Sequence, residues 1–330
     1  MNIKYEYIVF YIIFLYTIPT LCEITCRNEN NEYLDWFVAI KHPKSYNFVY
    51  LSSANADSHW KESNYDLKSE KNLIAITLQQ SYLHCNTKCF YIYYNDDRPL
   101  SNSSTKGGHL KGILNMDDST GYWLTHSVPN FPMENEYFFN KAQSIYGQSF
   151  MCVSIKNTYL KPIVQQLLMM QATVYSSFYP TSFTNDMELI SLLPRLIKNI
   201  RSKNLVSNIL HFKTLNSMNL LHFAKSPKYD QDLYSKLIAP TLNGSLFVET
   251  WRNGRGSKLD SACELKYKVN NVEEINLSNK SFKSTSDHSK WAISQSKSSP
   301  YICIGDINRM ESQFKRGGGS LCTSNVNIWE

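Results

Sequence analysis

A short pattern of chemically capable residues occurs twice in this sequence, in two distant places. Each copy has a histidine, a lysine two positions later and an asparagine about twenty residues further on. The copies are His109, Lys111 and Asn130, and His288, Lys290 and Asn308. From histidine to asparagine there are 21 residues in the first copy and 20 in the second. A single His-x-Lys is usually a solvent-exposed pair without a function. The repeated order is hard to ascribe to chance, so we take these six residues as the candidate catalytic set.

These residue types suit the cleavage of a phosphodiester. Lysine ammonium groups and asparagine amides can hold the non-bridging oxygens and stabilise the charge of the transition state without a metal. One histidine can attack phosphorus while the other donates a proton to the leaving oxygen and then activates water to release the phosphohistidine. Two close imidazoles titrate as a coupled pair, so we expect activity to be highest below neutral pH. The sequence does not decide which histidine attacks.

Each motif is expected to begin a β-hairpin. In the first copy an apolar pair at 113–114 precedes a turn at 117–121 and a strand at 122–124. In the second, apolar residues 292–293 precede a serine-rich turn ending at Pro300 and a strand at 301–304. Residues two apart on a strand face the same side, so each histidine and its lysine would point together. If the copies pack about a pseudo-two-fold axis, all six residues meet in one cleft.

The remaining pattern indicates β-rich parts joined by helices. Residues 36–40 are typical of a buried strand with a hairpin partner at 48–51. Between 161 and 201 the spacing is helical, with Pro162 in a first turn and Pro194 interrupting a second helical stretch that begins near Met187. A short helix near 232–238 and a strand at 246–251 follow. We therefore expect an α+β fold with two related halves, 23–160 and 212–330, each a β-rich layer with flanking helices, joined by a helical connection at 161–211.

Residues 1–22 are interpreted as a signal peptide. Lys4 precedes an apolar stretch from Ile8 to Ile18, and a small-residue cleavage region follows near Cys22. A membrane anchor is the alternative, but the apolar stretch is short for a bilayer. We expect a secreted or lysosomal protein that has no membrane association once the signal is removed.

The cysteines and the glycosylation sequons are consistent with a secreted or lysosomal protein. The eight cysteines are at 22, 26, 85, 89, 152, 263, 303 and 322, and the sequons are at Asn102, Asn243, Asn276 and Asn279. Removal of Cys22 would leave an odd number, so at least one thiol is unpaired. Cys85 and Cys89 beside His84 could bind a metal, but without a second ligand pair at zinc spacing we prefer a Cys85–Cys89 disulfide and no metal site.

Composition excludes several classes of protein and favours an anionic partner. The 330 residues are 42% hydrophobic and 13% aromatic, with only 12 glycines, which excludes disordered, collagen-like and coiled-coil chains. Lysine and arginine number 34 against 28 acidic residues, a formal net charge of +6. Such a surface suits a polyanion, although many solvated surfaces are equally basic.

Several longer motifs occur in order along the chain. They are Asp35-Trp36-Phe37-Val38, the stretch 122–132, Phe223-Ala224-Lys225, Asp232-Leu233-Tyr234-Ser235, Asp287-His288-Ser289-Lys290-Trp291, Gly305-Asp306-Ile307-Asn308-Arg309 and Arg316-Gly317-Gly318-Gly319. These motifs resemble the deoxyribonuclease II family. The resemblance extends from about residue 26 to 324. This family is similar in active-site plan to the phospholipase D superfamily. The resemblance implies a metal-independent acid endonuclease of lysosomes or secretions that needs no cofactor, cuts double-stranded DNA and leaves 3′-phosphates.

The resemblance also assigns residues. It makes His288 the residue most firmly expected to be catalytic, with His109 opposite it and the two lysines and two asparagines around the phosphate. It pairs Cys26 with Cys152 and Cys303 with Cys322. The sequence departs from the family in ending at Glu330, short of a tail that usually supplies a partner for Cys263, and in having Ala292 where a cysteine often follows the tryptophan.

Three neighbouring residues have more than one interpretation. His126 could be a third catalytic imidazole, but we favour a structural hydrogen-bonding role. Asp287 is left out of the catalytic set because adjacent side chains on a strand face opposite sides. Arg316 and the three glycines after it could form a loop that binds substrate phosphate or a plain flexible connection.

The expected partner is the DNA backbone, with little dependence on base sequence. The alternative is a catalytically inactive secreted DNA-binding homologue that acts as a scavenger or effector. A lipid phosphodiesterase is a third possibility, disfavoured because we find no amphipathic membrane-binding stretch. The oligomeric state is open between a monomer with an intramolecular site and a homodimer.

Overall fold

The computed structural model describes residues 23–56, 59–83, 89–100, 107–180, 183, 186–200, 205–254, 256–277 and 280–330. The expected signal peptide, the residues His84 and Cys85, and the sequons at Asn102 and Asn279 lie outside the described residues. Among the helices within these ranges, none is both long and apolar enough to cross a bilayer.

The first large sheet has eight strands in the order β10-β6-β7-β8-β9-β3-β4-β5, and every neighbouring pair is antiparallel. In chain order the strands are β3 (Trp36–Lys41), β4 (Phe48–Ser52), β5 (Lys61–Glu62), β6 (Phe90–Asn95), β7 (Lys111–Met116), β8 (Thr120–His126), β9 (Gln148–Lys156) and β10 (Val174–Phe178). The expected hairpin partners β3 and β4 do pair, and so do β7 and β8 across the expected turn.

The second large sheet has seven strands in the order β11-β12-β19-β18-β17-β13-β14. In chain order they are β11 (Ser207–Lys213), β12 (Asn219–Lys225), β13 (Leu246–Glu249), β14 (Val269–Asn271), β17 (Trp291–Ser294), β18 (Tyr301–Gly305) and β19 (Gly318–Ser324). Only the β13–β14 pair is parallel. The expected hairpin after the second histidine motif is present as β17 and β18.

Helices and short ribbons complete the described chain. The α-helices are α1 (Leu73–Leu83), α2 (Leu160–Met170), α3 (Met187–Ile197), α4 (Ala239–Leu242) and α5 (Val326–Trp329). A single π-helical segment, η6, covers Tyr234–Ile238, and short 3₁₀ segments include η2 (Lys141–Ser144) and η8 (Glu311–Gln313). The small two-stranded sheets are β1 (Cys26–Arg27) with β2 (Tyr33–Leu34), and β15 (Glu274–Leu277) with β16 (Lys280–Lys283).

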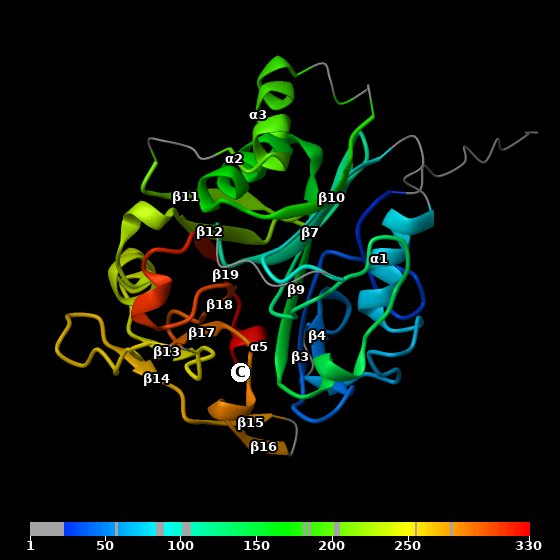
Figure 1. Cartoon of the computed structure of the whole chain (residues 1–330). Helices are drawn as coiled ribbons and strands as arrows, with labels where there is room; N and C mark the ends of the chain where they lie inside the picture. Colours follow the sequence, from blue (N-terminus) through cyan, green and yellow to red (C-terminus); the bar gives the residue numbers. More distant parts are fainter. Residues whose placement is uncertain are drawn as a thin grey trace, which may run out of the picture.

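Side-chain alternation explains how the two sheets share a core. On β8, Trp123 faces the core cluster that also contains Ile302 and Ile304 of β18, whereas Tyr122 and Leu124 face a second cluster under α1. On β18, Cys303 faces a third cluster, under η6 and α4. Each sheet is therefore buried on both faces, with one face against the other sheet. Figure 1 shows α2 and α3 above this junction and α1 on the outer side of the first sheet.

The helical predictions hold with two differences. Helix α2 begins as expected, with Pro162 in its first turn. Pro194 lies inside α3 and does not interrupt it, because Leu189, Leu192, Leu193 and Leu196 bury one face of the helix, which packs on α2. Strand β10, which joins the edge of the first sheet beside β6, lies between the two helices and was not predicted. The observed fold is mixed α and β, with sheets predominating.

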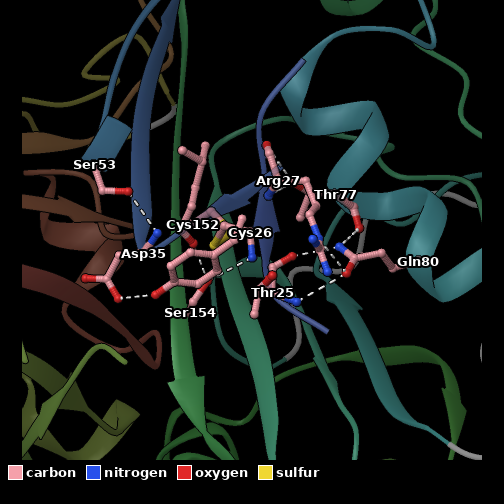
Figure 2. Close-up of a disulfide and its surroundings, with 11 residues drawn as sticks. Thr25, Cys26, Arg27, Asp35, Ser53, Thr77, Gln80, Cys152 and Ser154 are labelled. Atoms are coloured by element: carbon pink, nitrogen blue, oxygen red, sulfur yellow. Dashed lines mark hydrogen bonds between the residues drawn. A yellow bond between two sulfur atoms is a disulfide. The ribbon is translucent and has the colours of Figure 1, made fainter. Parts of the chain in front are cut away.

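The two disulfides implied by the resemblance are present. Cys26 bonds Cys152, and Cys303 bonds Cys322. In Figure 2 the Cys26–Cys152 bond is surrounded by polar contacts, including the Cys26 N–H, which donates to Ser154 Oγ at 2.9 Å. Cys89 is also disulfide-bonded, but its predicted partner, Cys85, lies outside the described residues. Cys263 is free and exposed.

Candidate functional site

The first histidine motif lies where β6 ends and β7 begins. Lys111 is the first residue of β7 and pairs with Asn95, so the next residue of that neighbouring segment, Asp96, lies beside the motif. Lys111 Nζ donates to Asp96 Oδ1, and His109 Nε2 lies 4.0 Å from Asp96 Oδ2. The motif thus contains a buried carboxylate that pairs with the lysine and faces the imidazole.

Arg316 reaches this motif from the second sheet. Its guanidinium donates to the carbonyls of Gly107 at 2.9 Å and Gly108 at 2.6 Å, and its Nη2 lies 3.2 Å from Asp96 Oδ2. These bonds commit the guanidinium to the backbone before His109 and to Asp96. In this structure Arg316 therefore orders the histidine loop, and the role in phosphate binding expected from sequence stays a prediction.

The second histidine motif lies just before β17. Lys290 Nζ is 3.1 Å from His288 Nδ1 and 3.4 Å from Nε2, and it also donates to the His288 carbonyl at 2.6 Å. The ring of His288 lies 5.3 Å from that of Trp251, which follows the end of β13. Here the imidazole is thus flanked by a lysine and an indole, with no counterpart of Asp96 among its described contacts.

Each histidine is held by backbone from the other large sheet. The His109 N–H donates to Gly317 O at 2.7 Å, and the His288 N–H donates to Gly147 O at 2.9 Å. The glycines lie immediately before β19 and β9, respectively. The side chains follow the same rule, because His109 Nδ1 is 2.7 Å from Asp306 O and His288 Nδ1 is 3.1 Å from Ser127 O. A carbonyl at Nδ1 favours a proton there, which leaves Nε2 of His109 available for chemistry. At His288 the Ser127 carbonyl favours the same tautomer, but Lys290 Nζ also contacts both ring nitrogens.

The cations and imidazoles of the two motifs influence one another. Burial lowers the pKa of His109 to about 3, and the charges of Lys111, Lys290 and Arg316 act in the same direction while Asp96 opposes them. Burial also lowers the pKa of His288 well below its usual value, helped by Lys290, Lys111 and His109. These mutual effects mean that the two motifs lie within electrostatic reach of each other. Both shifts disfavour protonation of the imidazoles in the free protein.

The buried lysine and carboxylate respond to the same environment. Burial and the Lys111 charge lower the pKa of Lys290 well below its usual value. Burial alone would raise the pKa of Asp96, but Lys111, His109 and Arg316 outweigh it and lower that pKa. Asp96, Asp287 and Asp306 oppose the lowering of the Lys290 pKa. A bound anion would oppose it in the same way, so it would stabilise the crowded lysines.

The two predicted asparagines occupy different surroundings. Asn308 is buried, and its Oδ1 has no hydrogen-bond partner among the residues described. Turning that amide about its last bond would present the NH₂ group, a donor for a phosphate oxygen. Asn130 adopts a left-handed backbone with φ of 55° and lines a cavity together with His288.

That cavity has a volume of about 280 Å³ and an aromatic wall. Tyr146 and Trp251 line it with His288, and their rings lie 4.6 Å apart in an edge-to-face arrangement. Tyr146 is 38% exposed, so the wall can be reached from solvent. Of the six predicted catalytic residues, Asn130 and His288 line this cavity and the other four do not. A cavity of about 700 Å³, by the edge strand β11, contains none of the six predicted catalytic residues.

The other residues discussed at sequence level have structural partners. His126 is buried, its Nδ1 accepts from the Val128 N–H at 3.2 Å, and its ring packs edge-on against Phe131. Asp287 is buried and accepts hydrogen bonds from the Ser289 hydroxyl and N–H. Burial raises the pKa of Asp287. Both residues support the backbone around the site.

Sequence reasoning did not identify Asp96, Trp251, Gly147 or Ser127 as part of the site. Asp96 and Trp251 follow the ends of β6 and β13, and only the strand register places them beside the histidines. Within the ranges that the structure covers, no group of three or more histidine, cysteine or acidic side chains is arranged to hold a metal ion.

Comparison with known proteins places the chain among nucleases. It is 34% identical to cell-death-related nuclease 7 of Caenorhabditis elegans over 93% of this chain and 85% of that protein. It is 36% identical to deoxyribonuclease-2-beta of Mus musculus over 93% and 90% of the two chains, and 32% identical to plancitoxin-1 of Acanthaster planci over 92% and 88%. The family model for deoxyribonuclease II matches residues 25–330. The chain belongs to the deoxyribonuclease II family, as the sequence motifs predicted.

Proposed function

We propose that this nuclease is an acid endodeoxyribonuclease that hydrolyses DNA phosphodiesters through a phosphohistidine, without a metal, and leaves 3′-phosphates. One observation carries this proposal: the backbone N–H and the ring Nδ1 of each histidine both contact backbone carbonyls that belong to the other large sheet. These reciprocal contacts support a site at the junction between the two sheets. The family membership and the nuclease relatives support the same reaction class.

The proposal includes two phospholipase D-like halves related by a pseudo-two-fold axis. The strand order β6-β7-β8-β9-β3 around the first motif has the same pattern as β13-β17-β18-β19-β12 around the second. In both, the histidine motif leads into the second strand of the five, and the glycine whose carbonyl accepts from the other histidine precedes the fourth. This correspondence supports a duplicated architecture with one shared site.

The neighbours of the imidazoles support a division of roles. Asp96 favours a proton on His109, whereas the Lys290 ammonium disfavours one on His288. His288 Nε2 therefore attacks phosphorus, the bond from phosphorus to the 5′-oxygen breaks, and His109 gives that oxygen its proton. Neutral His109 then takes a proton from water, which attacks phosphorus and breaks the phosphorus–nitrogen bond. The product retains the phosphate on the 3′-oxygen, and His288 is regenerated.

Charge on the substrate explains why acid is needed. Both histidine pKa values are lowered in the free protein, so the imidazolium of His109 forms only as the pH falls. A phosphodiester anion between the two lysines would raise that pKa and help to form the singly protonated pair. We propose a secreted or lysosomal setting, which the two disulfides support because such bonds persist in oxidising compartments.

Plasmid nicking tests the proposal. The purified chain is assayed at about pH 5 and pH 7 with excess chelator, alongside His288→Ala and His109→Ala. We expect cleavage by the wild type in chelator, faster at the lower pH, with loss in both variants of at least about 10³-fold. A plasmid that is retarded in a gel but never cut would favour an inactive DNA-binding homologue, and cleavage that requires an added metal would refute the mechanism.

A further inference from the structure

Two lysines outside the histidine motifs are completely buried. Lys41 ends strand β3 and Lys225 ends strand β12, and each is 0% exposed. Burying an ammonium group is unfavourable unless its hydrogen bonds are replaced. The contacts of these two side chains therefore indicate what they stabilise.

Lys41 donates only to backbone carbonyls. Its Nζ lies 2.7 Å from His42 O, 2.9 Å from Ser45 O and 2.9 Å from Ser144 O. The first two belong to the β3–β4 turn and the third to η2. Three residues after Ser144 comes Gly147, whose carbonyl accepts the N–H of His288. Lys41 thus ties down the segment that holds the histidine of the other sheet.

Lys225 makes the corresponding set of bonds in the second sheet. Its Nζ lies 2.9 Å from Gln313 O, 2.8 Å from Phe314 O and 2.6 Å from Arg316 O. The residue after Arg316 is Gly317, whose carbonyl accepts the N–H of His109. Three acceptors match the three N–H groups of an ammonium ion, so neither lysine keeps a donor for substrate.

The two lysines occupy equivalent places. Lys41 lies on the strand that pairs with β9, which Gly147 precedes, and Lys225 lies on the strand that pairs with β19, which Gly317 precedes. We propose that they are positioning residues that act across the molecule: Lys41 fixes the segment that holds His288, and Lys225 fixes the segment that holds His109. The inference rests on the proposed catalytic roles of the two histidines.

The held segments need close positioning because Gly147 lies very close to a side-chain carboxylate and Gly317 lies very close to backbone. A Cβ on Gly147 would lie 2.3 Å from Asp287 Oδ1, and a Cβ on Gly317 would lie 2.0 Å from Met170 O. Contacts this close leave little freedom for either loop to move relative to the histidine. Loss of the ammonium would release three carbonyls at once and displace the attached imidazole.

The test measures the chemical reactivity of each histidine separately in the variants Lys41→Met and Lys225→Met. Reaction with diethyl pyrocarbonate is followed by mass spectrometry of the peptides that contain His109 and His288. We expect Lys41→Met to change the modification rate of His288 and not of His109, and Lys225→Met to do the reverse. In single-turnover cleavage both variants should be slowed about 10- to 100-fold with little change in KM, as expected for misplaced reacting groups.

Matched controls are Lys44→Met and Lys315→Met, which remove exposed lysines from the same segments. These variants should leave the modification rates of His109 and His288 unchanged. If the methionine variants do not fold, glutamine variants, which keep two N–H donors, are assessed by the same pattern. Equal changes at both histidines, or no change in a folded variant, would overturn the inference. The histidine modification does not need cleavage, so the result is separate from the nuclease test.

Discussion

The two histidines of this site differ chiefly in one neighbour each. Strand pairing gives Asp96 and Trp251 the same place relative to their motifs, because β6 pairs with β7 as β13 pairs with β17. Asp96 faces His109 across 4.0 Å, whereas the Trp251 ring lies 5.3 Å from that of His288. A carboxylate stabilises an imidazolium, and an indole leaves its neighbour neutral and desolvated. This difference is consistent with the different roles proposed for the two histidines.

Replacing Asp96 should shift the pH dependence of cleavage. Asp96 raises the pKa of His109 against the lowering effect of burial, so Asp96→Asn lowers that pKa further. The protonated acid then forms only at lower pH, and the maximum of kcat/KM should move towards acid. The pH–rate profile is compared with that of Asp97→Asn, a neighbour that is not among the carboxylates acting on His109. A profile of Asp96→Asn that is unchanged or shifted upward would contradict the assigned role.

Trp251 should contribute binding through a nucleoside next to the cleaved phosphate. Stacking of a base on an aromatic side chain is worth roughly 1–3 kcal/mol, so Trp251→Ala should raise KM for a short oligonucleotide about tenfold. The measurement is repeated on substrates that lack the base on either side of the cleaved bond. For one of these the variant and the wild type should have the same KM. If the ratio of the variant KM to the wild-type KM were the same on the intact substrate and on both substrates that lack a base, Trp251 would not contact a base.

At the scale of elements, local patterns were predicted well and long-range contacts were not. The hairpins β7–β8 and β17–β18 follow from alternation and turn residues inside one stretch of sequence. The positions of Gly147 and Gly317 depend on contacts across more than a hundred residues, which one sequence does not record. Strand β10 was missed for the same reason, since it is defined by its pairing with the distant β6.

Gly317 should tolerate no side chain, whereas a glycine in a looser turn should. Gly317→Ala places a Cβ 2.0 Å from Met170 O, and Gly244→Ala meets nothing closer than 3.8 Å. Forcing extra atoms into packed structure typically costs about 1–3 kcal/mol, so Gly317→Ala should lower the free energy of unfolding by that amount. Urea unfolding measures both variants. If Gly317→Ala were as stable as Gly244→Ala, the distance between Gly317, just before β19, and Met170, at the end of α2, would have to be larger than described.

At the scale of the molecule, the two disulfides should contribute unequally to stability. Cys26–Cys152 closes a loop of 126 residues, and Cys303–Cys322 closes one of 19. The chain-entropy argument gives losses of about 5 kcal/mol and about 3 kcal/mol when the respective pairs are replaced by serine. Denaturant unfolding of the two double variants measures the difference. Cys263→Ser is the control, since that thiol is free and exposed, and a larger loss from the shorter loop would contradict the argument.

The backbone hydrogen bonds between each histidine and the other sheet also determine how late in translation the site can form. A ribosome makes His109 early, but the carbonyl that accepts its N–H belongs to Gly317, more than 200 residues later. His288 is likewise translated long after Gly147, its own acceptor. A growing chain therefore passes through most of its translation with neither imidazole fully seated. The two backbone hydrogen bonds that seat the histidines can therefore both form only after residues near each end of the fold have been made.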